Sequence, residues 1–342
     1  MKKYLAVAAK ILIAALLFAA ILMSTNWEEI VATASKIHPL TFFSLMGMVL
    51  LQAGVLALRW RIITRYTGHT LPLRDSVAGT LTSFFFSQGL PSSVGGDALR
   101  IWWLKRRDIP LRDATLSVML DRIIGLLALL IVCVLSLIIL GSRTDQAAFA
   151  LLSNLLAAAI VIGLGGALLF MVPRRTGASQ WALSCAERSP KWLSAIIRLC
   201  VELRNGFICL GRNSRDLLKI SILGISVHLI TVFVGYWVAA DLSAQVSFTD
   251  CLAVIAPALL ISYLPISIAG WGVREGTIVA AFALIGTPAN EALLISLMIG
   301  ASVLATSFIG GAIWMSGGMR DAFKLTTKAE APPNKVDTDT PL

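Results

Sequence analysis

Charged residues are scarce in this chain. Asp, Glu, Lys and Arg together make up 14% of its 342 residues, whereas hydrophobic residues make up 57%, and the mean hydropathy is +0.82. A soluble domain needs a polar exterior and carries about 25% charged residues. The composition therefore excludes a soluble globular protein and predicts an all-α, polytopic membrane protein.

Motifs of soluble catalysis and of metal binding are also missing. The sequence contains no HExxH, no GxSxG and no phosphate-binding GKS/T loop. Its five cysteines form no CxxC pair, so neither a zinc site nor a disulfide framework is indicated. No polar stretch is long enough for a nucleotide-binding domain, which excludes an ATP-driven pump. We expect no enzymatic activity, no metal and no cofactor.

The formal net charge of +10 comes from basic segments that lie between apolar runs rather than on one amphipathic face. Nucleic acid is therefore not an expected partner, and the positive-inside rule explains the charge instead. This rule places the connections 59–75, 100–113 and 173–219 in the cytoplasm. We accordingly expect a multi-pass protein of the bacterial inner membrane, with both termini in the cytoplasm.

Long apolar runs are what the sequence has in abundance. A helix needs about 20 apolar residues to cross roughly 30 Å of hydrocarbon. Six runs meet this requirement and are predicted to span the membrane: 5–23, 39–58, 114–140, 147–172, 218–240 and 291–316. The first is too long for the apolar core of a signal peptide and lacks a small-residue cleavage site, so we interpret it as a retained helix.

Two further apolar regions, 76–99 and 251–287, have both flanks on one side of the membrane by the charge rule. Each is interrupted by Pro and Gly, which leaves backbone groups unpaired unless protein or water surrounds the break. We predict two re-entrant helical hairpins that line a cavity. The second arm of the second region, from Gly272 to Pro288, is nearly twice as long as its counterpart, so a full crossing is the alternative there.

The predicted hairpins open to opposite sides, and each lies between two spans. The chain thus divides into a membrane domain, residues 1–324, and a disordered tail, residues 325–342. Within the membrane domain, the halves 39–140 and 218–316 form an inverted repeat, which is typical of alternating-access transporters. Residues 173–217 between the halves read as a cytoplasmic amphipathic linker.

The two breaks have similar sequences. Residues 90–100 and 264–274 are identical at five of eleven positions, and each segment ends in an arginine four residues after a glycine. A helix that begins at such a break directs N–H groups and its positive dipole end at the cavity, where they favour a phosphate, and the arginine adds bidentate contacts. The candidate substrate-binding residues are Ser93, Gly95, Gly96, Asp97, Arg100, Ser267, Gly270, Gly272, Arg274 and Glu275, with support from Gln88, Pro91, Asp121, Arg122 and Pro265.

Structural ion pairing is the alternative role for these charges. Asp97 could pair with Arg100 three residues later, and Arg274 with the adjacent Glu275. Asp121 is expected to face a hairpin arginine, whereas Arg122 is expected to extend to the membrane interface. His228 lies in the middle of a predicted span, where a hydrogen-bonded packing role is favoured over a proton relay.

Taken together, these sequence motifs make the chain resemble the lysylphosphatidylglycerol synthase transmembrane-region family of flippase-like proteins. The resemblance is carried by residues 90–100, by Asp121-Arg122 with Gly125, and by residues 264–276. It implies a membrane module that moves or accommodates phospholipid or polyprenyl-linked lipid. In bifunctional relatives a soluble domain follows and attaches an amino acid to phosphatidylglycerol. This chain stops at Leu342 without such a domain, so it resembles a stand-alone member, and lysine transfer is not expected of it.

The sequence therefore predicts a lipid translocase whose partner is a phospholipid or a glycolipid of the membrane. The alternative is an integral-membrane accessory protein or enzyme of lipid-linked sugar or glycolipid biosynthesis. A third reading is a scaffold whose basic linker recruits a separate synthase or glycosyltransferase. Small residues in several spans also permit packing against a second copy of the chain.

Overall fold

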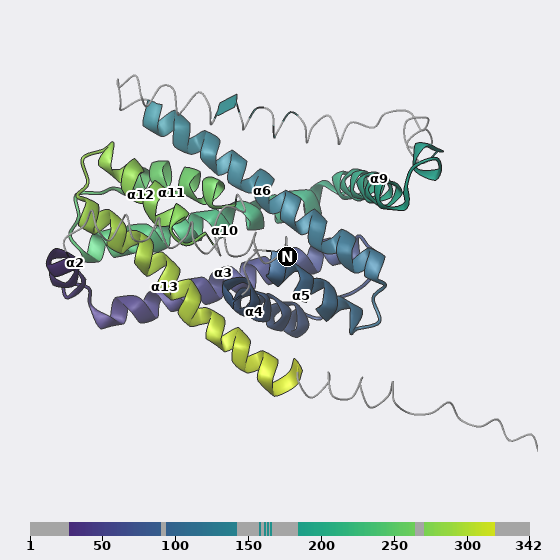
Figure 1. Cartoon of the computed structure of the whole chain (residues 1–342), viewed down its shortest axis with the longest axis horizontal. Coiled ribbons are helices and arrows are strands. Elements are labelled where there is room, and N and C mark those ends of the chain that lie inside the picture. Colours follow the sequence, from purple (N-terminus) through teal and green to yellow (C-terminus); the bar gives the residue numbers. More distant parts are fainter. Residues whose placement is uncertain are drawn as a thin grey trace, which may run out of the picture.

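The computed structural model describes residues 27–89, 94–141, 184–263 and 270–318, together with isolated positions between 157 and 165. Those residues form helices and turns (Figure 1). The helices are α2 (Trp27–Ala34), α3 (Pro39–Arg65), α4 (Leu73–Gly89), α5 (Val94–Lys105), α6 (Leu111–Gly141), α9 (Lys191–Gly211), α10 (Ser214–Asp241), α11 (Phe248–Ser262), α12 (Val273–Ala283) and α13 (Ala289–Ile313), which continues into a π-helical turn, Trp314–Gly318.

Four helices are long and apolar enough to cross a membrane. They are Pro39–Arg65, Leu111–Ile138, Ser214–Asp241 and Ala289–Gly317. They confirm four of the six predicted spans and make the chain a multi-pass membrane protein. The predicted spans 5–23 and 147–172 lie outside the described residues, apart from isolated helical positions in the second. The tail 325–342 also lies outside them.

The prediction that a cytoplasmic connection begins at Arg59 is wrong. Helix α3 continues six residues further, to Arg65, and Arg59 is only 3% exposed. An arginine at the end of an apolar run looks like an interfacial residue. Here it is instead held inside the helix bundle by a carboxylate of α6.

Hydrogen bonds between helix ends show that α3 and α10 lie antiparallel. The backbone N–H of His38, before α3, donates to the Asp241 carboxylate at the end of α10 over 2.9 Å. At the other end, the Tyr66 hydroxyl donates to the Asp216 carboxylate over 3.0 Å. We call the first end of the bundle the α2 end and the second the α9 end, because α2 and α9 lie at these ends (Figure 1).

The four shorter helices form two pairs that open to opposite ends. Helices α4 and α5 open at the α9 end, where Arg107 after α5 pairs with Asp75 in the first turn of α4. Helices α11 and α12 open at the α2 end, because α11 follows the end of α10 and α12 precedes the start of α13. Residues beside the two breaks meet inside the bundle, where Trp271 Nε1 donates to Gln88 Oε1 over 3.3 Å.

Helix α12 is short for the full crossing that the sequence left open as an alternative for the second arm. It has 11 residues, against 12 in α5, and therefore extends about 16 Å at ~1.5 Å per residue. That length is far short of the roughly 30 Å of a bilayer core. A turn at 284–288 separates it from α13, so 272–288 is not one continuous helix.

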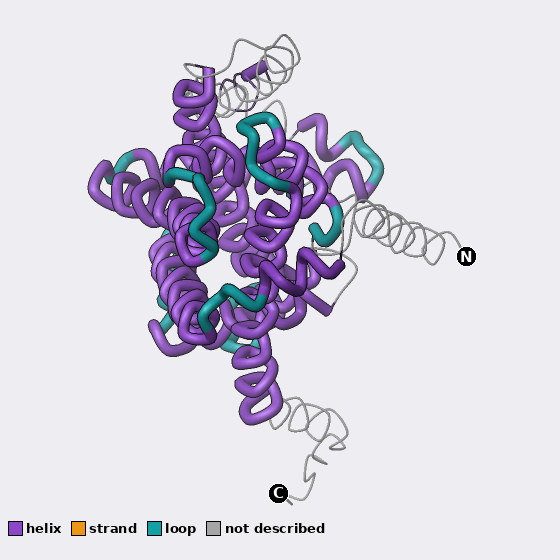
Figure 2. Tube along the Cα trace, turned by 90° about the vertical axis from the view of Figure 1, so that its left-hand side faces the viewer, coloured by secondary structure: helices purple, strands orange, loops and turns teal. Residues whose placement is uncertain are grey.

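Helix packing follows the same scheme in both halves of the chain. We match α3, α4, α5 and α6 with α10, α11, α12 and α13, in that order. Each close contact among these helices then has a counterpart in the other half. For example, α4 packs against α13 as α11 packs against α6, and α3 packs against α13 as α10 packs against α6. Helices α3 and α10 pack against each other. An end-on view shows these helices gathered in one bundle (Figure 2).

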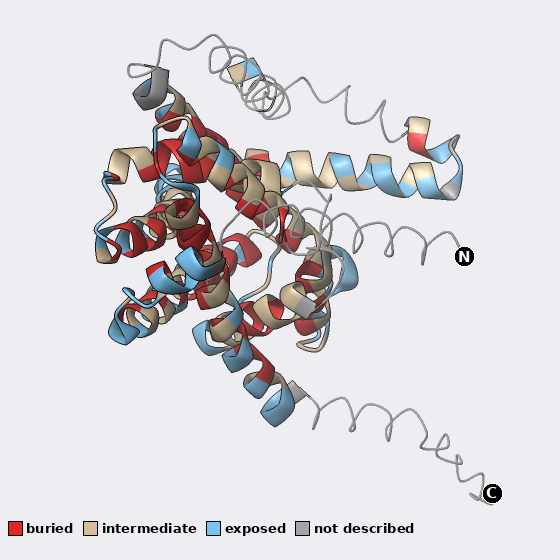
Figure 3. Cartoon of the chain, turned by 60° about the vertical axis from the view of Figure 1, so that its left-hand side comes forward, coloured by how far each residue is buried: buried red, intermediate tan, exposed pale blue. Residues whose placement is uncertain are grey.

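The close contact of α4 with α13 depends on Gly310. A Cβ there would lie 1.9 Å from the Leu81 carbonyl oxygen, so only glycine permits this approach. Figure 3 shows buried residues along the inner faces of the crossing helices. Within the predicted linker, α9 is amphipathic: Phe207 and Leu210 pack into a cluster with residues of α3, α6 and α10, whereas Trp192 is 67% exposed.

Candidate functional site

A polar cavity of about 280 Å³ lies inside the bundle. We call it the central cavity. Its polar lining comes from both halves of the chain and consists of Gln52, Arg59, Thr80, Ser83, Ser87, Asp97, Arg100, Asp121, Arg122, His228, Thr231, Tyr263 and Arg274. The structure therefore brings together the two predicted arginines, Arg100 and Arg274, although they are 174 positions apart in the sequence.

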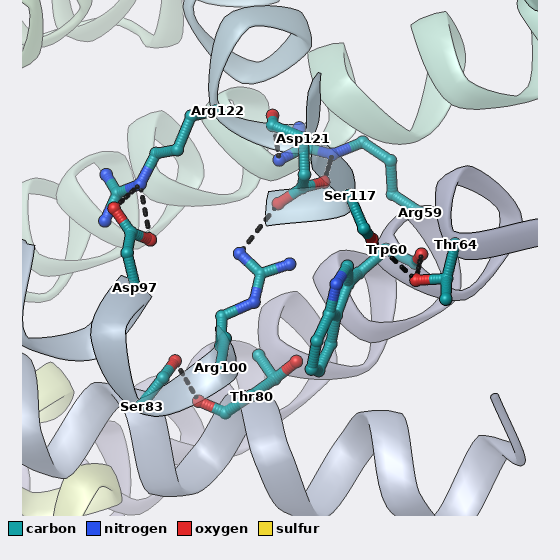
Figure 4. A network of polar contacts seen from close by, with 10 residues as sticks. All are labelled: Arg59, Trp60, Thr64, Thr80, Ser83, Asp97, Arg100, Ser117, Asp121 and Arg122. Atoms are coloured by element: carbon teal, nitrogen blue, oxygen red, sulfur yellow. Dashed lines mark hydrogen bonds and ion pairs between the residues drawn. The ribbon is translucent and has the colours of Figure 1, made fainter. Parts of the chain in front are cut away.

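Asp121 is held between two arginines (Figure 4). Arg59 Nε donates to one of its carboxylate oxygens over 2.8 Å, and Arg100 Nη1 donates to the other, also over 2.8 Å. The Asp121 residue is 1% exposed. The expected contact of Asp121 with a hairpin arginine is confirmed. One carboxylate cannot neutralise two guanidinium groups, so this triad carries a net positive charge.

Asp97 pairs with Arg122 and not with Arg100. Arg122 Nε lies 2.8 and 2.7 Å from the two carboxylate oxygens of Asp97. The expectation that Arg122 extends to the membrane interface is therefore wrong. Neighbouring residues on a helix point about 100° apart, so α6 directs Asp121 towards α3 and α5 while Arg122 reaches the first turn of α5.

The second half of the chain builds its arginine site differently. Arg274 Nε donates to the adjacent Glu275 carboxylate over 3.0 Å, and Arg274 Nη2 contacts the same oxygen. Glu275 is fully buried and also accepts from Ser296 of α13 over 3.4 Å. This is the ion pair predicted as the alternative to substrate binding.

Glu275 also changes the prediction for the start of α12. Its second oxygen accepts the backbone N–H of Gly272 over 2.6 Å, so the chain's own carboxylate caps this helix. Gly270 and Gly272 adopt φ angles of 81° and 82°, which only glycine takes without strain. The predicted anion site on the N–H groups of α12 is thus already occupied, and Arg274 is the remaining anion-binding group there.

Glycines make room for the charged side chains. A Cβ on Gly300 of α13 would lie 2.2 Å from Arg274 Nη2, and one on Gly125 would lie 3.1 Å from Arg59 Nη2. A Cβ on the predicted Gly96 would meet Ser87 Oγ at 2.1 Å, so Gly96 serves the close packing of α5 on α4. Gly95 beside it is half-buried.

The remaining predicted residues fall into two groups. Gln88 joins the two breaks through Trp271, as described above. Pro91, Ser93, Pro265 and Ser267 lie outside the described residues. His228 donates from Nε2 to the Gly125 carbonyl oxygen over 3.0 Å, which is the hydrogen-bonded packing role expected of it.

The central cavity has spare capacity to bind an anion. Four arginines and two aspartates are among its described lining residues. In the part of the chain that the structure describes, Arg100 Nε and Arg59 Nη1 are buried without a hydrogen-bond partner. Buried N–H donors are normally satisfied, and the Arg100 guanidinium is also held 4.2 Å from the Trp60 ring centroid. An oxyanion is the ligand that would satisfy these donors.

Arg59 is the site residue that the sequence interpretation missed. It follows Gln52 by seven positions, which is about two helical turns, so the two residues share one face of α3. Gln52 donates to the Val227 carbonyl oxygen and to the Thr231 hydroxyl of α10 over 2.9 and 2.8 Å. A polar face on an apolar helix was the signal that could have identified Arg59.

Comparison with protein families identifies the family of this chain. Residues 7–311 match the family model described as the lysylphosphatidylglycerol synthase TM region. No curated protein matches the chain. The match covers every described residue that lines the central cavity, and it indicates a membrane protein of lipid metabolism or lipid translocation.

Proposed function

The chain belongs to the lysylphosphatidylglycerol synthase transmembrane-region family, and on this premise we propose that it is a lipid translocase. It moves a phospholipid or a lipid-linked headgroup between the leaflets of the bacterial inner membrane, without making or breaking covalent bonds. One observation carries this proposal. The central cavity holds more arginines than carboxylates, and two of its guanidinium groups keep buried, unpartnered N–H donors within the described residues.

Headgroup phosphate is the part of a lipid that this cavity can accommodate. Its volume of about 280 Å³ lies just below the usual range of roughly 300 to 1,000 Å³ for small-molecule sites. The acyl chains therefore stay in the bilayer while the headgroup enters between the helices. An ionised side chain at the bilayer centre costs roughly 2.5 to 3.5 kcal/mol on insertion scales. A lipid phosphate that crosses the bilayer centre meets a barrier of the same kind, and arginines that bind the phosphate lower it.

In this proposal Arg100 and Arg274 bind the phosphate, and the carboxylates hold the arginines in its absence. Asp121 and Glu275 orient the two guanidinium groups, and Asp97 does the same for Arg122. Such pairs keep the four arginines of the cavity, three of them buried, from repelling one another in the empty state. A phosphate oxygen then binds the donors that remain, Arg100 Nε among them.

Alternating access follows from the two short helix pairs, which we propose are re-entrant hairpins related as an inverted repeat. They open to opposite ends, residues beside their breaks meet inside the bundle, and their contacts with the long helices correspond in the two halves. Inverted repeats give a transporter two equivalent conformations. If the α4–α5 pair and the α11–α12 pair each adopted the conformation of the other, the central cavity would be exposed to each leaflet in turn.

Leaflet exchange in proteoliposomes tests the proposal. Purified protein is reconstituted with a fluorescent phospholipid, and dithionite reports the fraction that has changed leaflet. We expect Arg100→Gln and Arg274→Gln each to slow exchange about ten- to hundredfold, because a hydrogen bond to a charged group contributes about 1.5 to 3 kcal/mol. Arg65→Gln, an exposed arginine at the end of α3, is the matched control and should exchange lipid like the wild type.

Two outcomes would overturn the proposal. Wild-type rates in both cavity variants would remove the arginines from the mechanism. No exchange by the wild-type protein, under any imposed ion gradient and with any native lipid, would instead favour an accessory role in lipid-linked sugar synthesis. In that case the exposed side of α9 is the first surface to examine for a partner enzyme.

A further inference from the structure

A second cavity, of about 440 Å³, lies at the α9 end of the bundle. The start of α4, the turn after α5 and the end of α13 with its π-helical turn enclose it. It shares no lining residue with the central cavity. We call it the basic cavity because of the side chains described next.

Three arginines and one aspartate are the charged residues among its described lining: Arg74, Arg106, Arg107 and Asp75. Asp75 is engaged by Arg107 in an ion pair whose side chains are both 29% exposed. The pKa of Arg106 is lowered from its ordinary value, first by burial and then by the neighbouring Arg107. Burial and the neighbouring Arg107 thus both disfavour the charged form of Arg106, and a bound anion would stabilise that form.

Aromatic rings fix the position of two of these arginines. The Arg106 guanidinium lies 4.6 Å from the centroid of Trp102, and that of Arg107 lies 4.6 Å from the centroid of Trp103. Trp102 packs in turn on Trp314 of the π-helical turn, with ring centroids 4.9 Å apart. Cations held on aromatic faces lose little conformational freedom when they bind an anion.

Two features of the cavity wall also point to a ligand. Trp103 lines the cavity and is 8% exposed, and within the described residues its buried Nε1–H has no hydrogen-bond partner. An indole N–H can only donate, so it calls for an acceptor such as an anionic oxygen. The opposite wall includes Ser316 and Gly317 of the π-helical turn, and such turns are rare and frequently lie at functional sites.

We propose that the basic cavity is a second binding site, which takes a phosphate-bearing anion between Arg74, Arg106 and Trp103. The phosphate belongs either to a lipid headgroup or to a soluble molecule. A lipid source accounts for the large exposed apolar side chains towards the same end of α13 and in the π-helical turn, where Phe308 and Met315 are 61% and 63% exposed. Amphipathic aromatic rings and arginines at a membrane–water interface bind headgroups in the same way.

Both cavities are lined by residues of α5. Arg100 lines the central cavity, and Trp103, three residues further along α5, lines the basic cavity. Three residues correspond to about 4.5 Å along a helix axis. An anion in the basic cavity is therefore held beside the same short helix that carries Arg100, although binding there does not depend on translocation.

Lipid binding to the full-length protein in detergent tests this site. Native mass spectrometry measures the affinity for dioleoyl phosphatidic acid and for dioleoyl phosphatidylcholine. We expect the double variant Arg74→Gln/Arg106→Gln to bind phosphatidic acid roughly 20-fold more weakly, because each arginine near a membrane surface contributes a factor of about five. The control Lys105→Gln removes an adjacent, exposed cation that does not line the cavity, and it should bind like the wild type.

Competition with inorganic phosphate separates the two sources. Displacement of phosphatidic acid by phosphate shows that the phosphate group is recognised and that a lipid supplies it. Phosphate binding that the double variant loses, with phosphatidic acid binding unchanged, assigns the site to a soluble phosphate. Wild-type affinity of the double variant for both probes, or an equal loss in Lys105→Gln, would overturn the proposal.

Two further variants keep the test decisive. Should the double variant fail to fold, Arg74→Glu reverses the charge of an exposed side chain alone and should weaken phosphatidic acid binding about 20-fold or more. Arg100→Gln should retain binding in the basic cavity even where it abolishes leaflet exchange. The two proposals therefore fail independently.

Discussion

Replacing Gly300 by alanine should displace Arg274 while leaving its charge in place. A Cβ at this position of α13 would lie 2.2 Å from Arg274 Nη2 and 2.9 Å from the Trp271 ring. Ordinary contacts begin near 3.4 Å, so the guanidinium must move by about 1 Å. A displacement of this size at a reacting or binding group can reduce a rate by about a hundredfold. We expect Gly300→Ala to lower leaflet exchange by ten- to hundredfold.

Stability should change much less than activity in this variant. The clash is with the far end of a flexible side chain, and alanine favours a helix by about 1 kcal/mol over glycine. Gly54→Ala in α3 is the matched control, because no atom lies within 4 Å of its added Cβ. The assay is dithionite-monitored exchange together with thermal unfolding in detergent. A folded Gly300→Ala protein that exchanges lipid at the wild-type rate would refute the assignment of Arg274 to the transport path.

Three other outcomes follow from the same contacts. Asp121→Asn should lower the free energy of unfolding by about 3 to 5 kcal/mol, because it leaves two buried guanidinium groups uncompensated; chemical denaturation in detergent measures this loss. The hydrogen bond from Arg107 lowers the pKa of Asp75, so their pair stabilises the fold above the unfolded-state pKa of about 4 and is lost as pH falls through the lower folded value. The Tm difference between wild type and Arg107→Gln should therefore shrink from pH 6 to pH 3, and a constant difference would contradict this role. Crosslinking of Gln88→Cys to Trp271→Cys, in a background without the native cysteines, should stop exchange until reductant is added if the two breaks separate during transport; undiminished exchange by fully crosslinked protein would show that they do not.

The long helices could be predicted from sequence because each one is a single continuous apolar run. Their ends were harder to place, since the charges that end an apolar run do not always end the helix. Arg59 shows the reason, because its burial depends on Asp121, 62 positions away in the sequence. Hydropathy along the chain carries no information on such a partner. The end of α12 at Ala283 was similarly hidden, because the apolar pattern continues towards the turn before α13.

The sequence identified several residues that line the central cavity, but it did not identify how they pair. The similar breaks identified Arg100 and Arg274, and both line the central cavity. Spacing along one helix suggested that Asp97 pairs with Arg100, yet tertiary packing brings Arg122 of α6 to Asp97 and leaves Arg100 to Asp121. Contacts between helices outweigh a local spacing of three residues when the partner side chains converge in one cavity.

The pairing scheme bears on which part of a lipid the cavity selects. Among the described residues, Asp97, Asp121 and Glu275 each already contact an arginine, whereas donors on Arg100 and Arg59 are unpartnered. A cationic headgroup amine would have to displace an arginine to reach a carboxylate, and would leave that arginine buried without a counter-ion. A phosphate displaces nothing and satisfies the open donors. If the cavity binds a lipid as we propose, it discriminates through the phosphate that phospholipids and lipid-linked sugars share, and the amine of a zwitterionic lipid adds little to recognition there.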